Sequence, residues 1–107
     1  MLAPLGEFEV VVLMAVLHLA DEANGSAARL EIERRTGRRV SRGSVYVTLD
    51  RLEGKGLLSS RLVAAPTVRG GIRRLFRATP AGIKAVKHAV STLAQMHVGL
   101  ERVIGAK

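Results

Sequence analysis

Side chains that can donate hydrogen bonds to an anionic partner are concentrated between residues 40 and 58. The segment is VSRGSVYVTLDRLEGKGLL, and Ser41 near its start is a residue type that caps helices. Val45, Leu49 and Leu52 then recur at intervals of four and three, which places them on one face of a helix. Hydroxyl and guanidinium groups fall on the remaining surface, from Arg42, Ser44, Tyr46, Thr48 and Arg51. Such a helix suits a groove of duplex DNA, and the pattern is equally typical of an amphipathic surface helix.

No arrangement typical of an enzyme or a metal site accompanies these donors. The sequence has no cysteine, which excludes disulfides and Cys-based zinc sites and agrees with a reducing, cytoplasmic location. The histidines, His18, His88 and His97, lack the spacing of metal ligands. No glycine-rich phosphate loop precedes a helix, and no nucleophile stands in a recognisable catalytic context. We therefore expect a protein that is not an enzyme and that uses no cofactor.

The charge of the chain is positive and unevenly distributed. The sequence has 17 Lys and Arg against 9 Asp and Glu, a formal net charge of +8. Residues 29–77 hold thirteen of the basic residues and four acidic ones, so this block carries +9 while the rest of the chain is near neutral. A localised basic block predicts a polyanionic partner, because arginine binds phosphate and guanine through two parallel hydrogen bonds. The alternative is a generally basic protein without such a partner.

An apolar run at residues 10–20 does not indicate a membrane segment. The run is shorter than the roughly 20 residues needed to cross a bilayer. Glu7 and Glu9 precede it, where a signal peptide would be basic. We interpret the run as the interior face of a first helix over residues 5–21, and we expect no contact with a membrane.

A helix-turn-helix is predicted within the basic block. Ser26 is expected to cap a second helix that ends near Arg35, and residues 36–39, TGRR, form the turn before the third helix. Gly54 and Gly56 are expected to end that third helix, the latter in a left-handed conformation. Two helices joined by a short glycine-containing turn are the sequence pattern of this DNA-binding motif.

Residues 58–78 change from helical to alternating periodicity. Extended segments at 58–63 and 72–78 flank a loop with the pair Gly70-Gly71, which predicts a β-hairpin. Its tip and flank carry Arg69, Arg73 and Arg74. A basic hairpin directly after a helix-turn-helix predicts the wing of a winged helix, with arginines that contact phosphates or a minor groove. The alternative is a solvated hairpin edge that its charges protect from aggregation.

The last predicted element is a long helix that Thr79 caps and Pro80 opens. Its apolar positions recur in steps of three and four over about three heptads, with one histidine among them. The seam is Ile83, Val86, Val90, Leu93, His97, Leu100 and Ile104, and from Val86 onward we expect it to form a dimer interface. A seam of this length needs a partner, and the first helix and a second copy of this helix are both candidates that we expect to contribute. A dimer would present two recognition helices. The alternative is a monomer that folds this helix back onto its own core.

Together these elements predict a mainly α-helical fold with a small β-hairpin, arranged as a winged helix-turn-helix with a long C-terminal dimerisation helix. The DNA-binding domain would span residues 1–79 and the dimerisation helix residues 80–107, in one compact unit. A single domain agrees with a length of 107 residues.

Several blocks of the sequence resemble the PadR family of bacterial transcriptional regulators. The first helix begins with LGEFE, the expected recognition helix has VSRGSVY followed by LDRLE and KGL, and the hairpin region contains RGG, RR and ATPAG. These blocks follow one another in the family's order over most of the chain. The resemblance implies a winged-helix homodimer that binds double-stranded DNA at a palindromic operator, usually as a repressor. In some members a phenolic or drug-like small-molecule effector controls the regulator.

The resemblance also assigns roles to residues of the recognition helix. Ser41 and Ser44 would donate to phosphate from its first turn. Tyr46 would pack near the groove wall, or alternatively stay half-buried in the core. Val47 departs from the family pattern, since many relatives have proline there. The chain also has no tryptophan and only three aromatic residues, which argues against a flat drug stacked between subunits.

Arg42, Thr48 and Arg51 are the candidates for contact with base edges or backbone. Arg51 has the alternative of pairing with a neighbouring carboxylate, Asp50 or Glu53. In the wing, Gly70 would allow the turn, and Arg69, Arg73 and Arg74 would reach phosphates. Two other functions stay open from the sequence: a winged helix that binds DNA or RNA without sequence preference, and a module that binds another protein.

Overall fold

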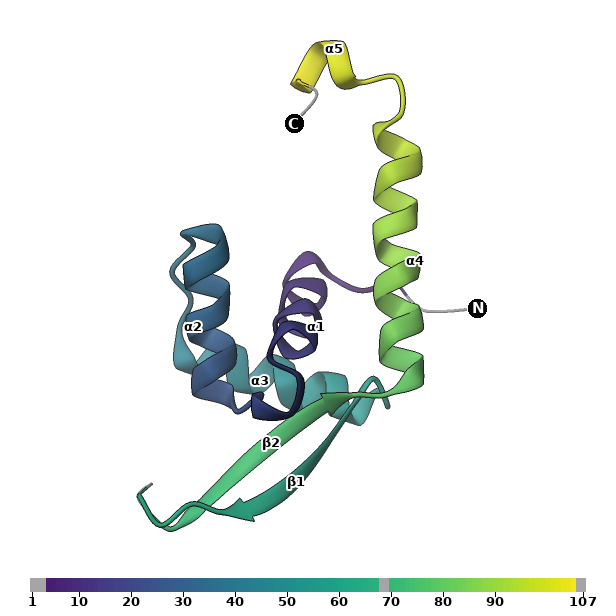
Figure 1. Cartoon of the computed structure of the whole chain (residues 1–107). Coiled ribbons are helices and arrows are strands. Elements are labelled where there is room, and N and C mark those ends of the chain that lie inside the picture. The colour runs from purple at the N-terminus through teal and green to yellow at the C-terminus, as the bar shows by residue number, and fades with distance from the viewer. Residues whose placement is uncertain (1–3, 68–69, 106–107) are drawn as a thin grey trace.

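The computed structural model describes residues 4–67 and 70–105 (Figure 1). In chain order its elements are α1 (Glu7–Leu19), the 3₁₀ segment η1 (Ala20–Glu22), α2 (Gly25–Thr36), α3 (Arg42–Gly54), β1 (Leu58–Ala64), β2 (Ile72–Ala78), α4 (Pro80–His97) and α5 (Glu101–Ile104). The predicted fold class, mainly helical with one small hairpin, is confirmed. None of the helices in the described ranges is both long and apolar enough to cross a membrane.

Helix α1 supplies the centre of the core because apolar residues surround most of it. Val12, Leu13 and Val16 are almost completely buried, and they cluster with residues of α2, α3 and the hairpin. The helix is shorter than the predicted span of 5–21. Ala20 adopts a φ of +51°, which ends the α-helical geometry, and the chain continues through η1.

Asn24, and not Ser26 as predicted, caps α2. Its side-chain oxygen accepts a hydrogen bond from the backbone N–H of Ala27 at 2.8 Å. Asparagine and serine are both good capping residues, so residue type could not distinguish the two positions. Gly37 ends the helix in the left-handed conformation, with φ +71°, and leads into the turn before α3.

Helix α3 agrees with the sequence-based prediction. The Ser41 hydroxyl caps it by accepting from the Ser44 backbone N–H at 3.1 Å, and Gly56 turns the chain beyond it with φ +76°. Val45, Leu49 and Leu52 are each 0% exposed, as their spacing predicted. The apolar stripe therefore fixes which side of α3 faces the core and which side faces solvent.

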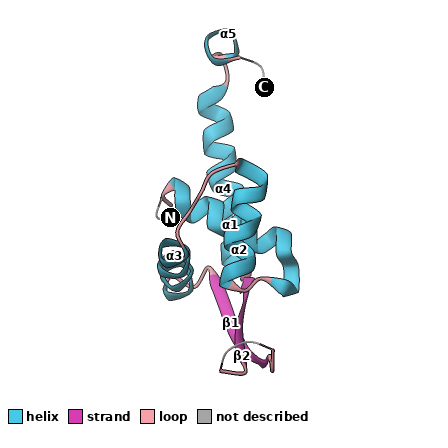
Figure 2. Cartoon of the chain, turned by 90° about the vertical axis from the view of Figure 1, so that its left-hand side faces the viewer, coloured by secondary structure: helices cyan, strands magenta, loops and turns pink. Residues whose placement is uncertain are grey.

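Strands β1 and β2 form the predicted antiparallel hairpin, with Leu58 opposite Ala78 and Ala64 opposite Ile72. The hairpin projects beyond the helices at one end of the molecule (Figure 2). Phe76 holds it to the core, because its ring is buried and its backbone N–H donates to the carbonyl of Ala23 at 2.9 Å. This arrangement leaves the outer half of the hairpin open to solvent.

Helix α4 packs on the rest of the chain only through its first turns. Thr79 caps it and Pro80 opens it, as predicted, and its buried residues are Gly82 and Ala85. Its later turns stand clear of the other helices (Figure 1). The prediction of one unbroken terminal helix is wrong, because Gly99 adopts a φ of +92° and the chain turns there before α5.

Candidate nucleic-acid interface

The outward face of α3 is the surface opposite its buried apolar stripe. Its exposed positions are Arg42, Gly43, Ser44, Val47, Asp50, Arg51 and Gly54. The central Val47 is 56% exposed although it is apolar. At the first turn the Ser41 and Ser44 hydroxyls are exposed and lie 2.7 Å apart, near backbone N–H groups that no helix carbonyl satisfies. Hydroxyl groups, backbone N–H groups of the first turn and guanidinium groups therefore lie together at the surface, where they can bind an anion.

Two predicted contact residues of α3 occupy other positions. Thr48 is 5% exposed, and its hydroxyl donates to the backbone carbonyl of Ser44 at 2.7 Å. The expectation that Thr48 contacts DNA does not agree with this burial, so we remove it from the interface. Tyr46 is half-buried, and its ring lies so close to Gly25 that any side chain at that position would overlap it. Tyr46 thus packs α3 on α2, which is the alternative that the sequence left open.

Internal ion pairs engage about half of the basic block. Seven of its thirteen basic residues pair with carboxylates of the chain: Arg29, Arg34, Arg35, Arg38, Lys55, Arg74 and Arg77. One of these carboxylates, Glu31, is buried and accepts from both Arg34 and Arg35. Their hydrogen bonds outweigh the effect of burial and lower the pKa of Glu31. These cations stabilise the fold and are not free to bind phosphate.

Five arginines of the basic block form no ion pair within the described ranges: Arg39, Arg42, Arg51, Arg61 and Arg73. The first lies in the turn before α3, the next two on α3, and the last two on the hairpin. Asp50 and Glu53 pair elsewhere, so the alternative partner for Arg51 is already engaged. Arg39 and Arg61 were not among the predicted contacts, since only the ion-pair pattern of the folded chain separates them from their paired neighbours.

The predicted wing residues fall into three groups. Arg69 lies outside the residues that the structure describes. Gly70 has φ +89° and Gly71 φ +72°, as a glycine turn requires. Arg73 is half-buried, with no ion pair among described residues, whereas Arg74 pairs with Asp50 and Glu53 of α3. Carboxylates of the chain already occupy the Arg74 guanidinium, so a phosphate would have to displace them; contact of Arg74 with phosphate stays a prediction.

A second ionic contact holds the end of α3 to the start of α1. Lys55 Nζ donates to Glu9 Oε2 at 2.7 Å, and the other carboxylate oxygen accepts from the backbone N–H of Gly6 at 3.0 Å. Burial raises the pKa of Glu9, but the hydrogen bonds from Lys55 and Gly6 outweigh it, so the pKa lies below its ordinary value. Glu9 is therefore ionised at neutral pH and helps to fix α3 on the core.

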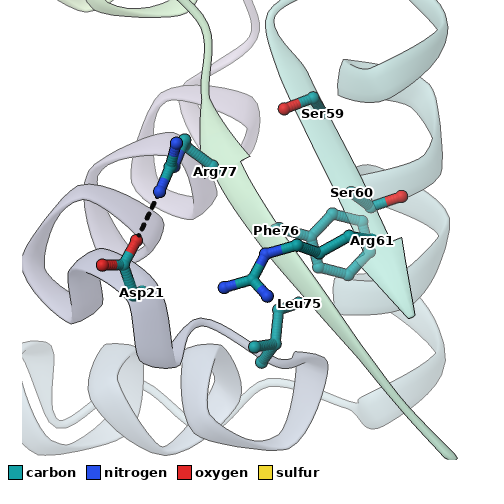
Figure 3. Close-up of a pocket in the computed structure, with 7 residues that line it drawn as sticks. All are labelled: Asp21, Ser59, Ser60, Arg61, Leu75, Phe76 and Arg77. Atoms are coloured by element: carbon teal, nitrogen blue, oxygen red, sulfur yellow. Dashed lines mark hydrogen bonds and ion pairs between the residues drawn. The ribbon is translucent and has the colours of Figure 1, made fainter. Parts of the chain in front are cut away.

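A small hollow lies between η1 and the hairpin (Figure 3). Its volume is about 80 Å³, and its polar lining includes Asp21, Arg61 and Arg77. Arg77 donates to Asp21 at 2.8 Å and lowers the pKa of that carboxyl. Nowhere in residues 4–67 and 70–105 do three potential metal ligands come together. The hollow is smaller than the roughly 300–1,000 Å³ of pockets that hold drug-sized ligands.

The predicted dimer seam divides between two helices. Val90 and Leu93 on α4 are 47% and 68% exposed, whereas Val86, nearer the root of the helix, packs partly on the core. His97 is half-buried at the end of α4. Leu100 and Ile104 are 45% and 60% exposed, but the turn at Gly99 separates them from the α4 stripe. A straight seam through all of these positions does not exist in this protein.

Comparison with known proteins decides the family. The family model described as "Transcriptional regulator PadR-like family" matches residues 13–88. The chain belongs to the PadR-like family of transcriptional regulators. This PadR-like regulator is 40% identical over 99 residues to the transcriptional regulator Rv3488 of Mycobacterium tuberculosis, a match that covers 87% of this chain and 89% of that protein.

Solved structures of PadR regulators have the same fold as this chain. A PadR family transcription regulator from Clostridium difficile gives a TM-score of 0.73 at 19% identity, over 94% of this chain and 100% of that one. A PadR-like transcriptional regulator from Bacillus cereus gives 0.73 at 17% identity, over 94% and 93% of the two chains. The family match runs from the second half of α1 to the first half of α4, so it includes the helix-turn-helix and the hairpin. It ends before the exposed stripe at Val90 and Leu93.

Proposed function

We propose that this PadR-like regulator binds double-stranded DNA as a homodimer, recognises an operator with two-fold symmetry and represses transcription there. The observation that carries the proposal is the outward face of α3, which is solvent-exposed and presents Arg42 and Arg51 without ion pairs among the described residues. A helix that is buried on one side and carries guanidinium groups on the other suits the major groove. Arg39 lies in the turn before that helix, Arg61 and Arg73 lie on the hairpin, and all three would contact the phosphate backbone.

The exposed stripe of α4 supports a homodimer. Val90 and Leu93 lie on turns that no other described element covers, and water is a poor environment for such a stripe. A second copy of the same stripe is self-complementary about a two-fold axis, which closes the assembly at two chains. The two α3 helices would then meet half-sites about 10 base pairs apart.

A small-molecule effector is not part of this proposal. The resemblance to the family implies one for some members, but the hollow beside Asp21 has a volume of only about 80 Å³. Cytoplasmic location follows from the proposed contact with operator DNA and rests on it.

Selection from a randomised duplex library, followed by titration, tests the proposed function. The full chain is used to select duplexes, and the recovered site and a shuffled duplex of equal length are titrated by fluorescence anisotropy at several salt concentrations. We expect a site with two-fold symmetry that is bound ~10³-fold or more tightly than the shuffled duplex. Contact of these five arginines with phosphate in both copies of a dimer predicts a slope of log K against log salt of about −9.

The three candidate functions give different results. Equal affinity for the two duplexes, with a steep salt slope, would identify a binder without sequence preference. Absence of binding to either duplex would identify a module for another partner. A strong preference for a site without symmetry would support the proposed regulatory function and contradict the proposed dimer.

A further inference from the structure

Arg74 on β2 has the most completely engaged guanidinium among the described residues of the hairpin. Each of its three nitrogen atoms donates to a different side chain: Nη1 to Asp50 Oδ1 at 2.7 Å, Nε to Ser60 Oγ at 3.1 Å, and Nη2 to Glu53 Oε1. The guanidinium carbon also lies 4.6 Å from the centroid of the buried Phe76 ring. The side chain is therefore held by charge, by hydrogen bonds and by a cation–π contact together.

The partners of Arg74 come from different elements. Asp50 and Glu53 belong to α3, Ser60 belongs to β1, and the Ser60 hydroxyl in turn donates to Glu53 at 2.7 Å. We call Arg74 with these three partners the Arg74 cluster. It joins the exposed edge of the recognition helix to both strands of the hairpin, beyond the buried contacts of Phe76.

The neighbouring Arg73 provides the contrast. Successive residues of a strand point to opposite faces, so Arg73 lies on the face of the hairpin away from the Arg74 cluster. Arg73 forms no ion pair within the described ranges. Partial burial lowers the pKa of Arg74, but its hydrogen bonds to Asp50 and Glu53 outweigh this effect. The pKa of Arg74 therefore lies above its ordinary value, and the side chain stays positively charged. A phosphate would have to displace two carboxylates to reach Arg74.

We infer that Arg74 is a positioning residue, which fixes the hairpin relative to the recognition helix and so supports discrimination between DNA sequences without touching DNA. The inference rests on the proposed function. Discrimination needs the bases and the flanking backbone to be contacted in one register, and a hairpin that swings freely would contact the backbone of any sequence.

The position of the hairpin can be measured without DNA. The chain has no cysteine, so Gly54→Cys at the end of α3 and Thr67→Cys on the hairpin loop provide two unique sites for spin labels. Both positions are exposed, and the distribution of distances between the two labels reports the position of the hairpin relative to α3. Labelled chains are diluted with unlabelled chains to suppress signals between copies. We expect Arg74→Met to broaden the distance distribution, and the matched control Arg73→Met to leave it unchanged.

A second variant keeps Arg74 and removes its partners. The double variant Asp50→Asn, Glu53→Gln should broaden the same distance distribution. If circular dichroism shows that Arg74→Met does not fold, the double variant alone tests whether the Arg74 cluster fixes the hairpin. Both variants should lower the affinity ratio of the selected site to the shuffled duplex by roughly three- to tenfold. Arg73→Met should lower the affinity for both duplexes by the same factor and reduce the salt slope, so the ratio of the two affinities should stay unchanged.

Opposite outcomes would overturn the inference. If Arg74 were a phosphate contact restrained by the carboxylates, the double variant would bind both duplexes more tightly with an unchanged ratio. An unchanged distance distribution in the folded Arg74→Met protein would equally exclude positioning. If the wild-type chain binds no DNA, the proposed function fails, while the distances in the DNA-free protein still show whether Arg74 fixes the hairpin.

Discussion

Replacing Gly82 with alanine should test how closely α4 is joined to the DNA-binding elements. Gly82 is buried in the first turn of α4, and an added Cβ would come within 3.0 Å of the backbone oxygen of Leu57 and 3.1 Å from its carbonyl carbon. Neither atom belongs to a flexible side chain. Thr79 fixes the same junction, because its backbone N–H donates to Leu57 at 3.1 Å and its hydroxyl to Gly56 at 2.7 Å.

The expected magnitude follows from two opposing effects. Alanine gains up to about 1 kcal/mol over glycine in helix propensity, and overpacking a close contact costs about 1–3 kcal/mol or more. Gly43→Ala is the matched control, since that helical glycine has nothing within 4 Å of an added Cβ. We expect Gly43→Ala to raise the thermal midpoint slightly. We expect Gly82→Ala to lie below this control by roughly 4–8 °C for each kcal/mol of difference.

Differential scanning calorimetry of the two variants and the wild type gives the comparison directly. In the proposed dimer, Gly82→Ala should also change the separation of the two α3 helices, because the clash lies in the first turn of the helix that would carry the interface. A Gly82→Ala protein as stable as Gly43→Ala would refute the reasoning, since the backbone of α4 would then not approach Leu57 as closely as described.

Three further variants test separate parts of the structure. Glu9→Gln should lower the unfolding free energy at neutral pH by about 1 kcal/mol, measured by urea titration. The pKa of Glu9 is depressed in the folded protein, so its contribution to the unfolding free energy is present above about pH 4.3 and is lost as the pH falls further. The unfolding free energy of Glu9→Gln should therefore decrease less than that of the wild type in this acidic range. Identical decreases in the two proteins would contradict this explanation. Leu93→Asp should sediment as a monomer, because it puts a charge on the exposed apolar stripe of α4. The control Gln95→Asp lies off this stripe and should sediment as a dimer. If both variants are dimers, the interface lies elsewhere. Val47→Glu should leave the unfolding free energy within about 0.5 kcal/mol of wild type and weaken DNA binding severalfold. Unchanged binding would exclude the outward face of α3 as the DNA contact.

Much of the fold followed from periodicity and capping. The buried stripe Val45, Leu49 and Leu52 could be predicted because a three-four spacing admits only one face of a helix. Thr79 with Pro80 likewise marks a helix start by residue type alone. The capping residue of α2 could not be predicted in the same way, because Asn24 and Ser26 are both of types that cap helices well.

The interface was harder to predict than the fold because residue type does not show which partner a charge finds. Arg73 and Arg74 are adjacent and chemically identical, and only the face of β2 that lies against α3 separates a free cation from a paired one. Thr48 was predicted as a contact because its polarity suggested exposure, yet its hydroxyl satisfies a helix carbonyl in the interior. The break at Gly99 interrupts an apolar spacing that by itself favours one continuous helix.

Hydroxyl-radical footprinting of the selected duplex tests the central claim most directly, namely that two copies of the chain present their α3 helices to DNA together. We predict two protected patches related by two-fold symmetry, with their centres about 10 base pairs apart. Val47→Glu should require severalfold more protein than the wild type to give the same protection of both patches. A single patch, or uniform weak protection along the duplex, would contradict the claim.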